Sequence, residues 1–304
     1  MVASKKYLIS GASGLVGEAL QQILDQKGHE VRKLVRRDPA KENEFFWDPE
    51  SGNLDEASLE GVDGVIHLAG ENIATGRWSE EKKQRLWNSR EKSTLLLARS
   101  MDRMATPPGV FISASGTGFY GDRGDEMVTE NSEPGSGYLS ELCQAWERAA
   151  TVGSGNDALR IVHLRIAPVL AVEGGLLPRI LPIFRAGLGG RLGTGKQYMP
   201  WIHLDDLVAI IAWCLGKKEI QGAVNAVAPE AVRNLEFTKT LGRILGRPTL
   251  FPAPAFVLKT AFGEMAEEML LSGARVSPKV LLDHGFPFGF PDLEKGLRDL
   301  LKRQ

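Results

Sequence analysis

The stretch Tyr7-Leu-Ile-Ser-Gly-Ala-Ser-Gly-Leu-Val-Gly17 decides the fold of this chain. It begins with an apolar run typical of a buried strand, and residues 16–24 then carry apolar side chains at helical spacing. Glycines at three-residue spacing join the two patterns. Between a strand and a helix, the first glycine permits a tight turn, the second admits a pyrophosphate, and the third lets the helix pack on the strand. The stretch therefore predicts a dinucleotide site, and a sharp turn without a ligand is the alternative.

The helix that follows this turn supplies the matching charge. Its first N–H groups have no partner within the helix, so they meet the phosphate charge of a bound dinucleotide. Glycines alone are weak evidence, but a strand before them and a helix after them make the pattern specific. The residues assigned to this part of the site are Gly11, Ser13, Gly14, Leu15, Val16 and Gly17.

A pair of arginines follows the second predicted strand. NAD sites usually carry an acidic residue there, about 20 residues after the glycine turn. Here the sequence reads Val35-Arg-Arg-Asp38. The guanidinium groups of Arg36 and Arg37 suit forked hydrogen bonds to a 2′-phosphate, so we expect NADP as the cofactor. Two alternatives stay open: a solvated strand end, and a register in which Asp38 supplies the acid.

Strand and helix patterns alternate along the first two-thirds of the chain. This order predicts an α/β fold with a Rossmann-like, doubly wound parallel sheet. The expected strands are 7–10, 29–35, 65–69, 109–113 and 161–165, and the expected helices are 16–24, 81–104, 139–151 and 205–215.

The last third of the chain has a different character. Glycine and proline become frequent after about residue 170, and helical pieces follow between prolines. We expect a smaller, mostly helical C-terminal domain on the substrate side, over residues 171–304. Residues 1–170 then form the NADP-binding domain, to which the chain near 203–228 returns.

Composition excludes several classes of protein. The chain has 304 residues, 43% of them hydrophobic and 25% charged, as in an ordinary globular protein. A net charge of -1 argues against a protein that wraps nucleic acid. The two cysteines and five histidines lack metal-ligand spacing, so we expect neither a disulfide scaffold nor a metal site. No apolar stretch is long enough to cross a bilayer, and we expect a cytoplasmic location.

Further motifs resemble a known family. The runs Asp63-Gly-Val-Ile-His-Leu-Ala-Gly70 and Ser113-Ala-Ser-Gly-Thr-Gly-Phe-Tyr-Gly121 resemble the extended short-chain dehydrogenase/reductases, whose sugar-nucleotide epimerases are best known. Residues 68–73, 186–197 and 201–206 are similar to an atypical branch often labelled "epimerase family protein", some members of which carry a cell-division-inhibitor name. Residues 247–301 are similar to that branch's own terminal domain. The resemblance covers nearly the whole chain.

The resemblance implies further cofactor contacts. Members of the branch are expected to bind NADP, in agreement with the arginines. By the family pattern, residues 68–70 line the adenosine and ribose side, Arg90 reaches the phosphates or the ribose, and the residues after the fifth strand meet the nicotinamide. The residues carried over are Leu68, Ala69, Gly70, Arg90, Pro168 and Val169. A homodimer through the helices that flank the sheet is usual for the superfamily.

The resemblance also implies a catalytic set, and the chain departs from it. Short-chain dehydrogenases use a serine, a tyrosine and a lysine four residues later, whose charge lowers the pKa of the tyrosine. Ser115 is the candidate serine, with Ser113 as the alternative, and Tyr138 is the candidate tyrosine. The lysine position holds Leu142, which places ordinary tyrosine-based proton transfer in doubt.

Other polar residues have structural explanations as well as catalytic ones. Tyr120 is expected to be structural, and Glu147 is expected to be a solvated helix residue rather than a functional carboxylate. The segment from His203 to Asp206 is explained by an aspartate that caps a helix beginning near Asp205. For the glycine-rich loop at 187–195, a substrate clamp and an inert connector are equally open.

Two functions remain from different classes. The first is an NADP-dependent oxidoreductase or epimerase that acts on a small-molecule substrate, in some members of the family a nucleotide-linked one, between the two domains. The second is a non-catalytic NADP-binding sensor or regulatory protein, since a site that keeps the glycine turn and arginines but loses the lysine fits that role.

Overall fold

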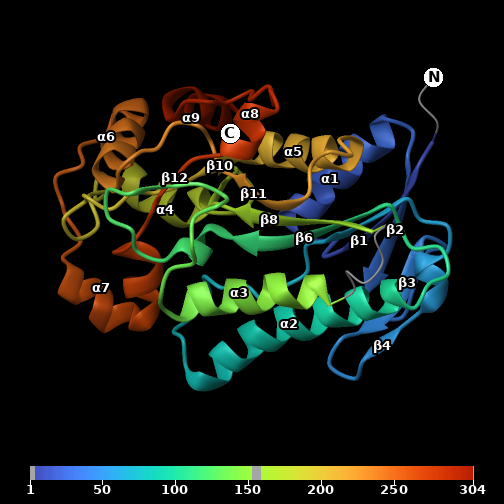
Figure 1. Cartoon of the computed structure of the whole chain (residues 1–304). Helices are drawn as coiled ribbons and strands as arrows, with labels where there is room; N and C mark the ends of the chain where they lie inside the picture. Colours follow the sequence, from blue (N-terminus) through green and yellow to red (C-terminus); the bar gives the residue numbers. More distant parts are fainter. Residues whose placement is uncertain (1–3, 153–158, 304) are drawn as a thin grey trace.

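A single sheet forms the centre of the structure, a computed structural model that describes residues 4–152 and 159–303 (Figure 1). Its strand order is β11-β8-β6-β5-β1-β2-β3-β4. Among the described residues, neighbouring strands of this sheet are parallel, apart from β3 and β4. The strands are β1 (Lys6–Ser10), β2 (Glu30–Val35), β3 (Glu44–Asp48), β4 (Asn53–Leu54), β5 (Gly64–His67), β6 (Val110–Gly116), β8 (Arg160–Ile166) and β11 (Gly222–Ala226).

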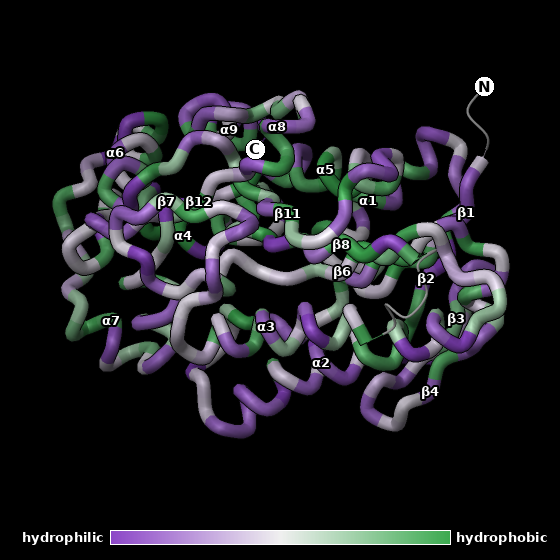
Figure 2. The backbone as a smooth tube through the Cα atoms, in the orientation of Figure 1, coloured by the Kyte–Doolittle hydropathy of each residue, from purple (hydrophilic) through white to green (hydrophobic). Residues whose placement is uncertain are grey.

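Helices cover both faces of this sheet. α1 (Leu15–Gln26) and α5 (Leu204–Gly216) pack together on one face, and α2 (Glu80–Asp102) and α3 (Tyr138–Thr151) pack together on the other (Figure 1). Alternate strand residues enter separate cores, because successive side chains of a strand point to opposite faces. Figure 2 shows the hydrophobic residues of the strands between these layers, whereas α2 is hydrophilic over much of its length.

The C-terminal region is mostly helical, as predicted. Its core surrounds Trp201, which is fully buried. Its longer elements are α4 (Leu177–Arg185), α6 (Asn234–Leu245), α7 (Ala255–Phe262), α8 (Lys279–Asp283) and α9 (Leu293–Lys302). The short ones are η3 (Ala266–Leu270), the pair β9 (Val169–Leu170) and β10 (Ile202–His203), and the pair β7 (Met127–Val128) and β12 (Arg275–Val276). The remaining short helices are η1 (Glu56–Leu59) and η2 (Thr117–Tyr120).

The predicted Rossmann-like fold is confirmed. The five expected strands are β1, β2, β5, β6 and β8, and the four expected helices are α1, α2, α3 and α5. The sequence patterns missed β3 and β4. The chain expected to return to the sheet contains α5 and β11, while the domain boundary at residue 170 stays a prediction. No helix of the described residues has the length and apolar character that crossing a bilayer requires.

Candidate functional site

The first and third glycines of the turn between β1 and α1 leave no room for a side chain. Gly11 adopts φ +71°, and a Cβ on it would lie 2.8 Å from the backbone nitrogen of Ala69. A Cβ on Gly17 would overlap the carbonyl oxygen of Gly11. The first and third glycines therefore do what the sequence predicts: one makes the turn, and the other brings helix and strand together.

The second glycine leaves the start of α1 open. Gly14 is the N-cap residue and no side chain caps the helix there, so the N–H groups of its first turn point out of the fold. Gln21 of α1 stabilises the turn, since its side-chain amide donates to the carbonyl oxygens of Ala12 (2.5 Å) and Gly17 (2.9 Å). The result is a rigid, uncapped helix N-terminus that suits a phosphate group.

The two predicted arginines differ in their contacts. Arg37 forms a forked ion pair with Glu44 of β3, with both N–O distances 2.8 Å. The Arg37 guanidinium and the N–H of Ala40 lower the pKa of Glu44 to about 2. Arg36 makes no hydrogen bond or ion pair with another residue of the described chain. Arg36 thus has its donors available for a phosphate, whereas Arg37 joins the segment after β2 to the first residue of β3.

A buried hydrogen-bond chain positions the segment after β5. The hydroxyl of Ser10 lies 2.5 Å from Nδ1 of His67 and accepts from the N–H of Ala69. Nε2 of His67 lies 3.0 Å from the Ser93 hydroxyl, which donates to the carbonyl of Ser89. Burial lowers the pKa of His67 to about 3, so the ring is neutral at physiological pH. This chain connects β1, β5 and α2 and fixes residues 68–70 beside the glycine turn.

Arg90 lies against the same segment and is buried. Its guanidinium donates to the carbonyls of Glu71 (3.0 Å) and Leu86 (3.1 Å) and covers the ring of Trp146. A Cβ on Gly70 would lie 3.4 Å from its Cζ. Burial lowers the pKa of Arg90, and no carboxylate within the described ranges pairs with it. A buried cation of this kind suits the anionic contact that the resemblance implies.

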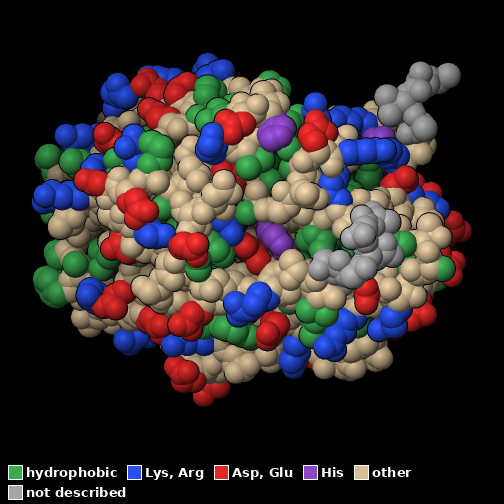
Figure 3. Space-filling model, viewed as in Figure 1, with side chains coloured by type: hydrophobic (Ala, Val, Ile, Leu, Met, Phe, Trp, Pro, Cys, Tyr) green, Lys and Arg blue, Asp and Glu red, His purple; other side chains and the backbone are tan. Residues whose placement is uncertain are grey.

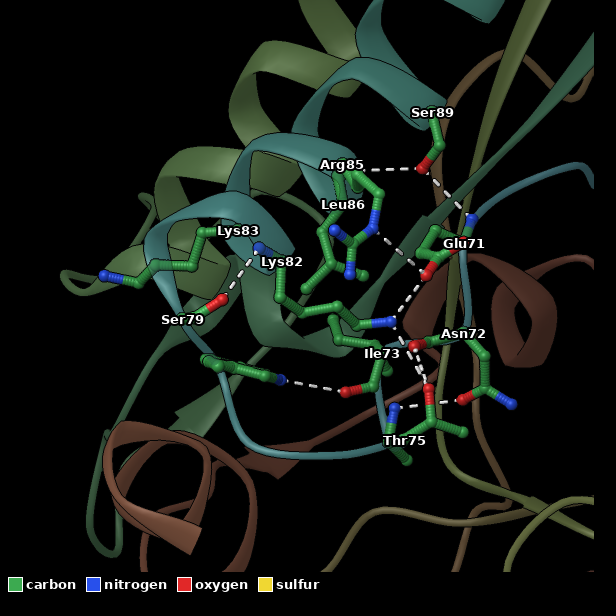
Figure 4. Close-up of polar contacts among 12 residues, drawn as sticks. Glu71, Asn72, Ile73, Thr75, Ser79, Lys82, Lys83, Arg85, Leu86 and Ser89 are labelled. Atoms are coloured by element: carbon green, nitrogen blue, oxygen red, sulfur yellow. Dashed lines mark hydrogen bonds and ion pairs between the residues drawn. The ribbon is translucent and has the colours of Figure 1, made fainter.

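The loop from Glu71 to Ser79 ties this segment to α2 (Figure 4). The Glu71 carboxylate lies 2.6 Å from Nζ of Lys82, whose side chain is buried, and the Glu71 N–H donates to the Ser89 hydroxyl. Ser79 caps α2 by accepting from the N–H of Lys82. Glu71 and Lys82 were not predicted as site residues, because nothing in their spacing indicates that they meet.

The same loop also contacts the C-terminal region. Arg179 of α4 donates to the carbonyl of Ala74, and Glu264 pairs with Lys83 of α2 at 2.7 Å. The Glu268 carboxylate accepts from the N–H of Leu139 at the start of α3. These contacts join the loop, α2 and α3 to the C-terminal region.

The structure does not bring the two candidate catalytic residues together. The Ser115 hydroxyl donates to Glu147 (2.8 Å), and the Tyr138 hydroxyl donates to the carbonyl of Lys83 (2.8 Å). Burial raises the pKa of Tyr138 to about 12. Trp78 and Trp87 pack against its ring, which therefore faces α2. Each of the two hydroxyls thus donates to a partner within the protein.

A different pair of α3 residues lies against the end of β6 and the η2 helix that follows it. Cys143 Sγ would lie 3.6 Å from a Cβ on Gly116, and the Leu139 side chain would lie 3.1 Å from a Cβ on Gly118. Leu139 and Cys143 are four residues apart, which is the family's spacing between the catalytic tyrosine and lysine. Their side chains cannot carry out the chemistry of those two residues. Burial raises the pKa of Cys143 to about 11, so its thiol stays protonated.

Glu147 is not the solvated residue that we expected. It forms a buried, forked ion pair with Arg165 of β8, with N–O distances of 2.8 and 2.9 Å. Arg165 stacks on Phe119 and donates to the Tyr120 hydroxyl (2.9 Å), which donates to Asn225 of β11 (2.7 Å). β8 places Arg165 against this side of α3, so the Glu147 carboxylate faces the sheet. Tyr120 is fully buried in the same cluster, consistent with the structural role expected for it.

Residues after β8 lie over the glycine turn. Pro168 accepts from the N–H of Ile202, and Val169 belongs to β9. A Cβ on Gly174 would lie 3.1 Å from the side chain of Leu15. The predicted nicotinamide contacts thus belong to a segment that approaches the start of α1.

His203 caps α5, which corrects the expected aspartate cap. Its Nδ1 accepts from the N–H of Asp205 (3.1 Å), so the ring proton lies on Nε2, 3.4 Å from the Asp299 carboxylate. These three residues are close enough to share an ion, but Arg303 pairs with both carboxylates (2.8 and 2.7 Å). Because the imidazole lone pair and both negative charges are already used, the cluster is a structural contact rather than a metal site.

Comparisons with known proteins agree with this geometry. Residues 7–226 match the NAD dependent epimerase/dehydratase family, and residues 253–300 match a domain of unknown function, DUF1731. An epimerase family protein of Mycobacterium tuberculosis is 41% identical over 287 residues, which is 94% of each chain. The human epimerase family protein SDR39U1 is 36% identical over 299 residues, covering 97% of this chain and 99% of the human protein.

Solved structures are similar over the whole chain. The crystal structure of human SDR39U1 (isoform 2) with NADPH has a TM-score of 0.91 and 34% identity, and covers 98% of this chain and 100% of that one. A nucleoside-diphosphate sugar epimerase of Corynebacterium glutamicum has a TM-score of 0.81 and 34% identity, with coverage of 99% of this chain and 59% of that one.

Proposed function

Since this chain belongs to the NAD dependent epimerase/dehydratase family, we propose that it binds NADP(H) along the carboxyl edge of its sheet. One observation carries the proposal: an uncapped helix N-terminus at Gly14 lies one strand away from Arg36, which forms no hydrogen bond or ion pair in the described chain. The first fits a pyrophosphate and the second fits a 2′-phosphate. The NADPH in the human relative's structure supports this choice of cofactor.

The residues of the site have distinct roles in this proposal. The backbone from Gly11 to Gly17 binds the pyrophosphate, and Arg36 selects the 2′-phosphate. Residues 68–70 contact the ribose side, and Arg90 supplies a fixed positive charge behind them. Pro168 and Val169 meet the nicotinamide, which supplies a hydride carrier when it is bound.

The chain binds this cofactor without a tyrosine and lysine pair. The Tyr138 hydroxyl is used by the Lys83 carbonyl and its pKa is raised to about 12. Ser115 is used by the Glu147 carboxylate. These contacts favour NADP(H) binding itself, in a sensor or regulatory protein, as the function. The alternative is an oxidoreductase or epimerase of a small nucleotide-linked substrate, which the name of the Corynebacterium relative supports.

We expect Tyr138→Phe to leave the function unchanged. The substitution removes one hydrogen bond to a backbone carbonyl and keeps the ring against Trp78. NADPH affinity, measured by calorimetric titration, should stay within about twofold of the wild type, since less than 0.5 kcal/mol is at stake. Metabolite screening that follows nicotinamide absorbance should give the same result for both proteins. A substrate-dependent oxidation of NADPH that Tyr138→Phe reduces about 100-fold or more would support the enzyme instead.

Arg36→Asp should change the choice of cofactor. It replaces the free cation with the acid usual in NAD sites, so it removes charge-assisted hydrogen bonds worth about 1.5–3 kcal/mol. NADPH affinity should fall about 10- to 100-fold, and NADH affinity should stay the same or rise. Asp38→Ala is the matched control and should change neither. If Arg36→Asp weakens NADPH and NADH equally, Arg36 does not select the phosphate.

A further inference from the structure

We infer that this chain binds the reduced cofactor, NADPH, more tightly than the oxidised form, NADP⁺. This preference rests on the proposed function and names the redox form that the same site selects. The two forms differ in charge only at the nicotinamide ring, which is neutral in NADPH and carries one positive charge in NADP⁺. A fixed, buried charge of the protein therefore changes their relative affinity. Arg90 supplies such a charge at the carboxyl edge of the sheet.

Neutral groups surround the guanidinium of Arg90. It donates to two backbone carbonyls and, at 3.4 Å, to the Ser89 hydroxyl, and the Trp146 ring lies against its face. The carboxylate of Glu71 is held by Lys82 at 2.6 Å and does not pair with Arg90 (Figure 4). These contacts hold the guanidinium in place but leave its positive charge unmatched. Since Arg90 is only 8% exposed, water screens that charge poorly.

The positive charge of Arg90 acts on its buried neighbours. Burial lowers the pKa of His67 to about 3, and the charge of Arg90 acts in the same direction. Burial raises the pKa of the Cys143 thiol to about 11, and the charge of Arg90 opposes that increase. His67 belongs to β5 and Cys143 belongs to α3. The field of this guanidinium on α2 therefore extends to both of those elements.

Cys143 connects this charge to the segment proposed for the nicotinamide. Its Sγ would lie 3.6 Å from a Cβ on Gly116, the last residue of β6, and the carbonyl oxygen of Ile166 would lie 3.9 Å from the same Cβ. Gly116 and Ile166 are partners in the pairing of β6 with β8. Pro168 follows two residues later. A positive ring at that segment would meet the field of a like charge, whereas the neutral ring of NADPH would not.

Other ionisable groups near the start of α3 are mostly paired or neutral. Glu147 is matched by Arg165, and burial raises the pKa of Tyr138 to about 12, so its hydroxyl stays protonated. Glu268 has no cation partner among residues 4–152 and 159–303. Its carboxylate accepts from the N–H of Leu139 in the first turn of α3, where the partial positive charge of the helix N-terminus offsets it.

Exposed charges do not provide a stronger field of one sign. Lysine and arginine side chains lie among aspartate and glutamate side chains over the face drawn in Figure 3. The whole chain has a net charge of -1. Salt screens exposed charges over about 8–10 Å, whereas it screens a buried charge much less. The buried guanidinium therefore contributes most to the difference between the two forms.

Calorimetric titration of the purified full chain with NADPH and, separately, with NADP⁺ tests this preference. The wild type should bind NADPH at least about 10-fold more tightly. Arg90→Met removes the charge and keeps an apolar stem against Trp146, so the ratio of the two dissociation constants should fall below about threefold. Arg90→Lys keeps the charge and should keep a ratio near that of the wild type. Arg85→Met, on the same helix and 61% exposed, is the matched control and should not change the ratio.

The outcomes separate this preference from the proposed function. Equal affinity of the wild type for both forms, or tighter binding of NADP⁺, would overturn the preference and leave the proposed function intact. No binding of either form would overturn both. A folded Arg90→Met protein that loses the same affinity for each form would also overturn the preference, because it would show that Arg90 contacts a phosphate common to both.

Cys143→Asp is the second variant, for the case that Arg90→Met does not fold. It places a carboxylate within the field of Arg90, where the two opposite charges stabilise each other. The preference for NADPH should then shrink to about threefold or less. A folded Cys143→Asp protein with the wild-type ratio would contradict the role of Arg90.

Discussion

Gly14→Val should lower NADPH affinity by at least about 100-fold, or 2.7 kcal/mol. Gly14 has φ −86° and ψ 166°, an extended conformation that valine adopts, and a Cβ there would lie 3.3 Å from the Gly11 carbonyl oxygen, a contact that a small shift relieves. The fold should therefore survive. The new side chain would stand at the uncapped start of α1 and keep a pyrophosphate away from the N–H groups there, and each lost charge-assisted hydrogen bond is worth about 1.5–3 kcal/mol. Calorimetric titration with NADPH measures the effect.

A second glycine provides the matched control for that measurement. Gly216 ends α5, and a Cβ on it would meet nothing within 4 Å. Gly216→Val should leave NADPH affinity unchanged. If Gly14→Val binds NADPH as the wild type does, while its circular dichroism spectrum shows a native fold, the glycine turn is not the pyrophosphate site.

Arg165→Leu should destabilise the protein by about 3–5 kcal/mol, because it leaves the buried carboxylate of Glu147 without its partner. Arg165 also stacks on Phe119 and donates to Tyr120, so its removal breaks the contacts that join α3, β8 and β11. The midpoint of urea unfolding, followed by circular dichroism, should fall accordingly.

Lys279→Ala is the control for this loss. Lys279 pairs with Asp283 on the surface of α8, and pairs of that kind contribute about 0.3–0.5 kcal/mol. Its unfolding midpoint should therefore stay close to that of the wild type. A second variant, Glu147→Gln combined with Arg165→Leu, removes the unpaired charge and should recover part of the lost stability. Equal midpoints for Arg165→Leu and Lys279→Ala would mean that the buried pair does not stabilise the fold.

Much of the fold could be predicted from local patterns. The run from Tyr7 to Gly17 needs its glycines for backbone reasons alone, and the structure has the tight turn and the close packing in the expected places. Buried parallel strands read as short apolar runs, so five of them are visible in the sequence. β4, at the edge of the sheet, has only two residues, and β3 beside it begins and ends with the acidic residues Glu44 and Asp48, so neither strand forms a long apolar run.

Side-chain partners could not be predicted, because they depend on residues that are distant in the sequence. Arg36 and Arg37 look equivalent in the sequence, but the structure places Glu44 beside Arg37. Glu147 resembles a surface residue until β8 places Arg165 against it. In both cases the charged residue could be recognised in the sequence, but its role depends on the residue that it contacts.

Helix rotation explains the uncertainty about catalysis. Tyr138 and Leu142 match the family's spacing of tyrosine and lysine, but Cys143 lies against the end of β6 and Leu139 against η2. A rotation of one residue, or 100°, separates the two faces of a helix. The sequence alone shows the spacing, and only the packing of α3 shows which pair faces the sheet.

The central claim is that this chain binds NADP(H) and selects it through Arg36, and titration of the purified wild type with NADPH and with NADH tests it most directly. We predict that NADPH binds at least about 10-fold more tightly than NADH, a difference of 1.4 kcal/mol. Equal affinity for both, tighter binding of NADH, or no binding of either would contradict the account.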